Sequence, residues 1–371
     1  MVDLQLGRIT APMKRPPTPS PSPPLILLLA FARCAVVFFG CAFLPLHAAD
    51  RVSSIHSPTQ TPLSAPAWKP HRPMMEPAFF AGTVAGSDGR IYVITGSTGE
   101  SGELTSRNSA YDPERDTWTK LAPIPTPRSE PGAALGPDGK IYIIGGNPTR
   151  SRQQSSKMNV VEAYDLKNNQ WTRCKPLPTP RTALCAATVS DKSGHAFIYA
   201  IGGRNFDMPG NGLSTLEAYD PTTDSWTTRS AMPINLHAMT ATAGPDGKIY
   251  VLGGTNSRTD DTNLVQVYDP ETDRWAPGNP MPFGQECACS AFIPGHNGEI
   301  VVMGGWGSLE KISLDLVAAY NPRTDTWRSL PKLITATAGA GAATVKSADG
   351  ALHIYVIGGM PDPTCVQEYG G

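Results

Sequence analysis

The chain has 371 residues, of which 40% are hydrophobic, and it contains 36 glycines and 37 prolines. The apolar content is sufficient for a folded core, and the glycine and proline content favours short strands and tight turns over long helices. Charged residues make up only 17% and the formal net charge is −1, so we expect neither a basic groove for nucleic acid nor an acidic tail.

Residues 1–49 are typical of a targeting segment. Seven prolines crowd residues 12–24, and an apolar run from Leu25 to Leu46 follows them, interrupted only by Arg33. The run is long enough to span a bilayer as a helix, and positive charges precede it while small residues follow it. A cleaved signal peptide with a Pro-rich n-region and an uncleaved membrane anchor are both open, as is a start at Met13, and a buried core helix is a further alternative.

The signal and the anchor have the same consequence for location. Either of them would place the later part of the chain outside the cytoplasm. We therefore expect an extracytoplasmic protein that is secreted, periplasmic or membrane-anchored, with its N-terminal segment inserted in the membrane if that segment is not cleaved. Residues 50–65 are rich in proline and serine, and they are predicted to be a linker.

Copies of one repeating unit fill residues 66–371. Six apolar runs end in a glycine doublet or its near equivalent, and a tyrosine and a tryptophan seven residues apart follow each of the first five. The runs are IYVITG at 91–96, IYIIGG at 141–146, IYAIGG at 198–203, IYVLGG at 249–254, IVVMGG at 300–305 and IYVIGG at 354–359. Their β-branched and aromatic residues predict buried strands, and the Asp-Gly pairs that precede several of them suit tight hairpin turns.

This pattern resembles the kelch repeat family over residues 68–371, because the doublet, the tyrosine and the tryptophan recur in register about every 50 residues. The resemblance implies an all-β fold, a six-bladed kelch β-propeller. The last copy ends without a tryptophan, whereas Trp68 lies 50 residues before Trp118. We expect the N-terminal strand around Trp68 to complete the last blade and close the ring.

The resemblance also implies a ligand-binding funnel, formed by the loops after the glycine doublets and the loops between blades. The candidate ligand-binding residues are Arg128, Ser129, Glu130, Arg181, Arg204, Asn205, His237, Glu286 and Trp306. Arg128 and Arg181 match an arginine at the start of the inner strand in kelch adaptors that bind acidic peptides, and Arg204-Asn205 resembles a ligand-facing pair. Because arginine binds carboxylates bidentately, a carboxylated ligand is the expectation. Trp306 could stack on a sugar or peptide ring, or fill the channel mouth.

Three functions are open. We favour an extracytoplasmic binding module, expected to be a monomer, that recognises a protein or a glycan on the funnel face. The alternative is a carbohydrate-active enzyme of the sialic acid mutarotase (N-acetylneuraminate epimerase) type, in which Glu130 and Glu286 would supply acid–base groups. A purely structural role is the third. A copper site like that of galactose oxidase is not expected, because only His237 maps to the funnel, and neither a metal nor another cofactor is predicted.

Five cysteines follow the targeting segment, namely Cys174, Cys185, Cys287, Cys289 and Cys365. The odd number leaves at least one thiol free. Cys174 and Cys185 flank an inter-blade loop and are the best candidates for a disulfide, while small buried residues are the simpler interpretation of all five.

Overall fold

The computed structural model describes residues 67–98, 102–149, 157–208, 210, 212–256, 261–294, 298–307, 309 and 311–370. The proposed targeting segment, residues 1–49, and the proposed linker, residues 50–65, lie outside these ranges. Nowhere in the described ranges does the chain form a helix of the length and hydrophobicity needed to cross a membrane.

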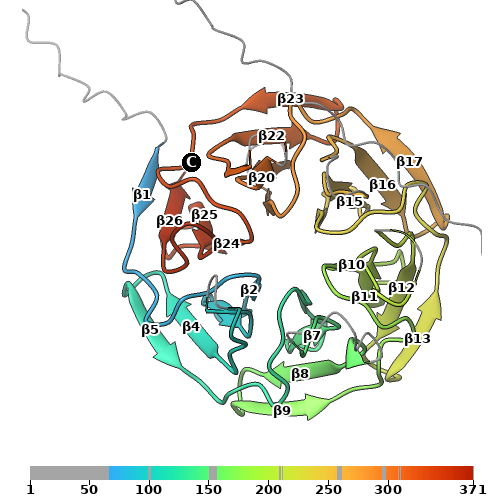
Figure 1. Ribbon diagram of the computed structural model, residues 1–371, viewed down its shortest axis with the longest axis horizontal. Helices are drawn as coiled ribbons and strands as arrows, with labels where there is room; N and C mark the ends of the chain where they lie inside the picture. Colours follow the sequence, from blue (N-terminus) through green and yellow to red (C-terminus); the bar gives the residue numbers. More distant parts are fainter. Residues whose placement is uncertain are drawn as a thin grey trace, which may run out of the picture. The chain divides into compact units, whose positions relative to one another are not determined.

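Six four-stranded antiparallel sheets stand around a central axis as the blades of a propeller (Figure 1). Blade 1 comprises β2 (Gly82–Ala85), β3 (Ile91–Ile94), β4 (Asn108–Asp112) and β5 (Thr117–Lys120); blade 2 comprises β6 (Gly132–Leu135), β7 (Ile141–Ile144), β8 (Val161–Asp165) and β9 (Gln170–Arg173); blade 3 comprises β10 (Cys185–Ser190), β11 (Ala196–Ile201), β12 (Leu216–Asp220) and β13 (Ser225–Thr228).

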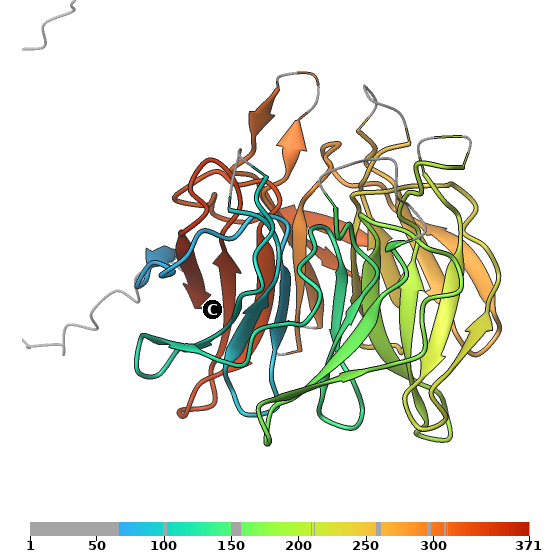
Figure 2. The same cartoon turned by 60° about the horizontal axis from the view of Figure 1, so that its bottom comes forward.

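Blade 4 comprises β14 (Thr240–Ala243), β15 (Ile249–Leu252), β16 (Val265–Asp269) and β17 (Arg274–Gly278); blade 5 comprises β18 (Cys289–Ile293), β19 (Glu299–Met303), β22 (Val317–Asn321) and β23 (Thr326–Ser329); blade 6 comprises β24 (Gly341–Lys346), β25 (Leu352–Ile357), β26 (Val366–Gly370) and β1 (Trp68–Pro70). A short hairpin of β20 (Trp306–Gly307) and β21 (Ile312–Ser313) is inserted in blade 5 and projects beyond the neighbouring loops (Figure 2). The predicted six-bladed kelch propeller is confirmed.

The glycine doublets are explained by a close approach between neighbouring blades. At the first glycine of the doublet in blade 2, Gly145, φ is +61°, and an added Cβ would lie 2.6 Å from the carbonyl oxygen of Arg181 in blade 3. Blade 1 has Thr95 at this position, with φ +56°, and its hydroxyl donates a 2.7 Å hydrogen bond to the carbonyl of Arg128 in blade 2. Thr95, which replaces the first glycine of the doublet, therefore maintains the contact between blades 1 and 2 through this hydrogen bond.

The ring of blades closes as predicted from the position of Trp68. Strand β1 pairs with β26 so that Trp68 lies opposite Tyr369, with ring centroids 5.4 Å apart. The indole Nε1 of Trp68 donates a 2.9 Å hydrogen bond to the carbonyl of Pro331 in blade 5. The other five repeat tryptophans each make the same bond to the previous blade, as Trp118 does to the carbonyl of Arg72 at 3.1 Å. The first described strand thus joins the last one and leaves no open edge between blades 6 and 1.

Candidate functional site

Six residues, one from each blade, form a closed ring of backbone hydrogen bonds around the channel axis. They are Phe80, Glu130, Ala183, Ala238, Cys287 and Gly339, and each has a φ between +51° and +68°. The amide nitrogen of each donates to the carbonyl oxygen of the ring residue in the preceding blade, with N···O distances of 2.7–3.0 Å. We call these residues the axial ring. All six line one cavity, so the side chains at these positions decide what that cavity offers to a ligand.

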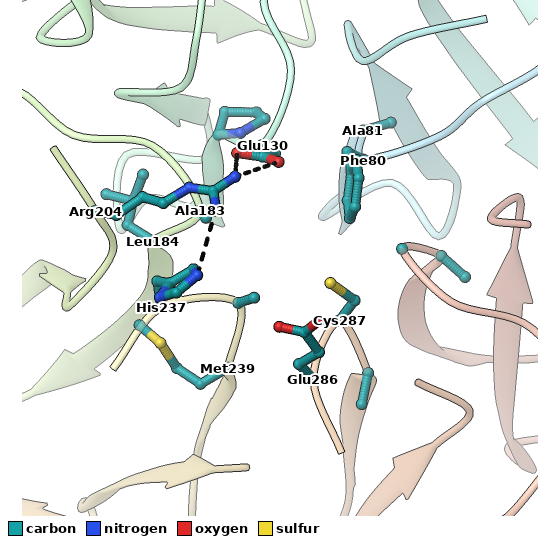
Figure 3. Close-up of a pocket in the computed structure, with 15 residues that line it drawn as sticks. Phe80, Ala81, Glu130, Ala183, Leu184, Arg204, His237, Met239, Glu286 and Cys287 are labelled. Atoms are coloured by element: carbon teal, nitrogen blue, oxygen red, sulfur yellow. Dashed lines mark hydrogen bonds and ion pairs between the residues drawn. The ribbon is translucent and has the colours of Figure 1, made fainter. Parts of the chain in front are cut away.

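The cavity has a volume of about 340 Å³ and lies at the axial ring (Figure 3). Four of its lining residues carry carboxylate, guanidinium or imidazole groups: Glu130, Arg204, His237 and Glu286. The rest of the lining is mainly apolar and includes Leu184 and Met239. This combination of a partly enclosed, mainly apolar lining with a few convergent polar groups is typical of ligand sites. We call this cavity the funnel.

One wall of the funnel is a chain of polar contacts centred on Arg204. Its Nη2 lies 3.3 Å and 3.4 Å from the two carboxylate oxygens of Glu130, and its guanidinium carbon lies 5.0 Å from the ring centre of Phe206. Its Nη1 lies 3.4 Å from Nε2 of His237. Because arginine can only donate, Nε2 is the accepting nitrogen of that imidazole. These distances exceed the 2.7–2.9 Å usual for charge-assisted hydrogen bonds, so this wall is loosely bonded.

The opposite wall carries Glu286 and Cys287 (Figure 3). The Glu286 carboxylate faces the funnel across from Arg204 and His237. Burial, together with the nearby charges of Glu286 and Glu130, raises the pKa of the Cys287 thiol well above its usual value. Cys287 therefore stays protonated at neutral pH and is not an activated nucleophile.

Arg128 and Arg181 do not line the funnel, and this corrects the expectation that they form its basic rim. Both are fully buried inside their blades. Arg128 Nη1 lies 2.5 Å from a carboxylate oxygen of Glu162, and Arg181 Nη1 lies 2.5 Å from Glu217. Each Nη2 also donates a 2.9 Å hydrogen bond to a strand carbonyl, that of Ile143 in the case of Arg128. Their guanidinium groups hold the blade together and are not accessible to a ligand.

The sequence contains a pattern that indicates these ion pairs, but the pattern is visible only when the repeats are compared with one another. A glutamate stands two residues before the repeat tyrosine only in blades 2 and 3, the two blades that carry the arginine. In blades 4 and 6 that position is Gln266 or Gln367, whose amides bond to the backbone of Ile234 and Thr335 instead. Comparing whole repeats would have paired each arginine with its own glutamate.

Three further candidates also lie outside the funnel lining. Ser129 forms a backbone bridge with Asn147, and the amide of Asn205 donates a 2.7 Å hydrogen bond to the carbonyl of Pro180. Trp306 begins the projecting hairpin and lines a separate cavity of about 570 Å³. Of the nine candidates, the structure brings together Glu130, Arg204, His237 and Glu286; it adds Phe80 and Cys287, which sequence reasoning had left out.

The cysteines of the described chain are free thiols, including Cys174 and Cys185. Cys185 is buried and its Sγ lies 2.9 Å from the carbonyl oxygen of Met239. Within the described ranges, no group of three or more histidine, cysteine or acidic side chains is arranged to hold a metal ion.

Propeller architecture, axial ring and funnel together define a class of β-propeller built from kelch-type blades. A family model described as the KLHDC2/KLHL20/DRC7 Kelch-repeats domain matches residues 37–237, and the Kelch motif model matches residues 237–282 and 288–334. The chain belongs to the kelch repeat family.

Curated relatives resemble part of this chain. Kelch-like protein 15 of Danio rerio is 26% identical over 216 residues, which cover 54% of this chain and 33% of that protein. Beta-scruin of Limulus polyphemus is 30% identical over 237 residues, which cover 63% of this chain and 25% of that protein. The matched region spans about a quarter to a third of the length of these relatives.

Two solved structures share the fold. The one entitled "Structure of YjhT" has a TM-score of 0.61 and 17% identity, and the match covers 81% of this chain and 96% of that one. A fungal alcohol oxidase of the AA5 family, in complex with copper, has a TM-score of 0.53 and 17% identity, with 79% and 62% coverage. At these identities the likeness concerns the fold.

Proposed function

We propose that this propeller is a binding module that receives a protein or glycan ligand in the funnel. The observation that carries the proposal is the convergence of Glu130, Arg204, His237 and Glu286, from blades 2 to 5, on one cavity of about 340 Å³. The funnel gathers charged and polar side chains from four blades around one open space. Kelch proteins in general bind protein partners, which agrees with this assignment.

A ligand panel on the full-length chain tests the proposal. Thermal shifts are measured with acidic and neutral sugars, sialic acid among them, and with short peptides of either charge. A ligand at 100 times its dissociation constant stabilises the folded state by about 2.7 kcal/mol. We expect a shift that is lost in at least one of Arg204→Gln and Glu286→Gln and that persists in Arg323→Gln, a control in an exposed turn of blade 5. A shift that survives Arg204→Gln and Glu286→Gln would place the ligand elsewhere.

We also propose that the propeller lies outside the cytoplasm. The support is the apolar run at residues 25–46 and its flanking charges, which lie outside the described ranges. Fusion of a periplasmic or secretory reporter to the C-terminus, with and without residues 1–49, tests this location. If the reporter is exported and active to the same extent without residues 1–49, that segment does not direct export.

An enzyme of the sialic acid mutarotase type is the second candidate. It is favoured by the two carboxylates, Glu130 and Glu286, which line the same cavity as Arg204 and His237 and could transfer protons to a bound sugar. Anomer exchange of sialic acid, followed by NMR, tests it. An enzyme loses its rate in Glu286→Gln, whereas a binding module shows no exchange above the uncatalysed rate in either form.

A further inference from the structure

The blade that closes the ring carries a buried carboxylate at a position where the other blades are apolar. Glu368 directly precedes the repeat tyrosine of β26, and its side chain is 9% exposed. The residues that precede the repeat tyrosine in blades 1 to 5 are Ala110, Ala163, Ala218, Val267 and Ala319. Removing a carboxylate from water is costly unless the group is paired and hydrogen-bonded. Glu368 therefore needs partners that the equivalent positions of the other blades do not need.

Two histidines from distant parts of the chain bind this carboxylate. His71 directly follows β1, which lies beside β26 at the edge of blade 6 (Figure 1), and its Nε2 contacts Glu368 Oε2. His353 of β25 contacts Glu368 Oε1 through Nδ1 at 2.5 Å. Because an ionised carboxylate only accepts hydrogen bonds, both of these imidazole nitrogens donate. We call the three residues the closure cluster, since they join the N-terminal strand to the last blade.

The second nitrogen of each imidazole also faces an acceptor. His71 Nδ1 lies 3.6 Å from Oδ1 of Asp116, in the turn between β4 and β5 of blade 1. His353 Nε2 lies 3.2 Å from the hydroxyl oxygen of Ser347, and that hydroxyl donates its own proton to Asp349 at 2.5 Å. A neutral imidazole donates from one nitrogen, whereas a protonated one donates from both. The arrangement of acceptors therefore fits two protonated imidazoles better than two neutral ones.

The two outer acids keep their negative charge at mildly acid pH. Burial raises the pKa of Asp116, but hydrogen bonds from the Tyr111 hydroxyl and the Arg72 amide outweigh it. Nearby positive charges, that of the exposed Arg72 among them, lower this pKa further. The hydrogen bond from the Ser347 hydroxyl lowers the pKa of Asp349. Negative charge close to an imidazole favours its protonated form.

The other groups that face the closure cluster do not oppose this effect. The cluster lines a cavity of about 560 Å³, and the further charged residues described in that lining are three cations and three anions: Arg90 with Asp88 at 2.7 Å, Arg115 with Asp112 at 2.6 Å, and Lys346 and Glu114. Two tyrosine rings pack edge-on against His71, that of Tyr355 at 5.7 Å and that of Tyr111 at 6.4 Å between centroids. Burial raises the pKa of both hydroxyls, so neither ring is charged.

We propose that the closure cluster is a proton-sensitive latch that holds the N-terminal strand on blade 6. Histidine ordinarily changes its charge between pH 5 and 8. At the acid end of this range both imidazoles donate charge-assisted hydrogen bonds to Glu368. As the pH rises each loses one proton, and His71 then turns an unshared electron pair towards the Asp116 carboxylate. Because the folded cluster favours the protonated form, the stability of the closure is complete at the acid end and is lost as the pH rises. The latch concerns the closure of the ring and does not depend on a ligand in the funnel.

Amide hydrogen exchange of the full-length chain at pH 5.5 and pH 8.0, followed by mass spectrometry, tests the latch. Protection factors are compared, so that the intrinsic effect of pH on exchange is removed. The reporting amides are those of His71 and Met74, which donate to backbone carbonyls of blade 6 at 3.0 Å and 2.9 Å. The reference amides are those of Arg229 and Met232, which occupy the same repeat positions in blade 3 and make the same bonds there.

We expect the reporting amides to be protected about fivefold or more better at pH 5.5 than at pH 8.0, because charge-assisted hydrogen bonds become neutral ones over this range. The reference amides should change less than about twofold. Glu368→Gln should remove most of the difference, since an amide accepts from one neutral imidazole and donates to the other. His195→Gln is the matched control and should retain it, because His195 lies 3.2 Å from Asp220 within blade 3.

Several outcomes would overturn the latch. Equal protection at the two pH values would do so, as would better protection at pH 8.0. A difference that persists in Glu368→Gln or disappears in His195→Gln would assign the pH response to other groups. A change of equal size in the reference amides would place the response in the whole propeller instead of its closure. If circular dichroism shows that Glu368→Gln does not fold, His71→Gln and His353→Gln replace it, and a pH response unchanged in both would refute the role of the cluster.

Discussion

Replacing Arg128 tests whether this arginine stabilises the interior of its blade or binds a ligand. In Arg128→Ala, the Glu162 carboxylate loses its ion pair and keeps the 2.9 Å bond from the Thr126 hydroxyl, and the carbonyl of Ile143 loses its 2.9 Å donor. Removing one partner of a buried ion pair costs about 3–5 kcal/mol, because a charge is left in a medium of low polarity. We expect the free energy of unfolding to fall by this amount.

Two variants serve as references for that loss. In Arg204→Ala the pair that is broken has side chains that are 27% and 18% exposed, so the cost should stay within about 1 kcal/mol. In the double variant Arg128→Met/Glu162→Leu no buried charge remains, so most of the stability lost in Arg128→Ala should return. The two arginines, equivalent as sequence candidates, should thus differ severalfold in their effect on folding.

Urea denaturation of the full-length chain, followed by tryptophan fluorescence, measures these differences. The six repeat tryptophans are suitable probes because the indole of each bonds to the neighbouring blade. An Arg128→Ala variant whose stability lies within about 0.5 kcal/mol of the parent would refute the assignment of Arg128 to the blade interior. So would a double variant no more stable than Arg128→Ala, since the loss would then not come from an unpaired charge.

Three more predictions follow from the same contacts. Trp68→Ala should cost about 3–5 kcal/mol, measured by urea denaturation, and wild-type stability would refute the closure of blade 6. Burial raises the pKa of Asp273, but hydrogen bonds from the Ser230 amide and the Tyr268 hydroxyl outweigh it and lower the pKa overall. The stability that this carboxylate contributes is therefore complete above about pH 4 and is lost as the pH falls below that value. The melting temperature of Asp273→Asn should accordingly depend less steeply on pH in the acid range than that of the parent. Cys287 should react with iodoacetamide at pH 8 more than about tenfold slower than glutathione, and mass spectrometry showing an equal rate would contradict its raised pKa.

The sequence by itself determined the propeller and the way it closes. The glycine doublets, the Tyr–Trp pairs and the orphan Trp68 are local patterns that each specify a strand, a turn or a contact with the next blade. Because every blade repeats the same contacts, six weak signals reinforce one another. Trp68 could be placed in blade 6 from sequence alone because it fills the one tryptophan position that the last repeat lacks.

Only the tertiary structure decided which charged residues reach the funnel. Arg128 and Glu130 are two residues apart, yet the first is buried in blade 2 and the second lines the cavity. The difference comes from the backbone. Glu130 has a φ of +55°, and its backbone forms hydrogen bonds with the neighbouring residues of the axial ring. The sequence has neither glycine nor asparagine at this position to indicate such a turn. The partner of Arg128, Glu162, lies 34 residues further along the chain. Charge at a propeller axis depends on such long-range pairings, which a local pattern does not contain.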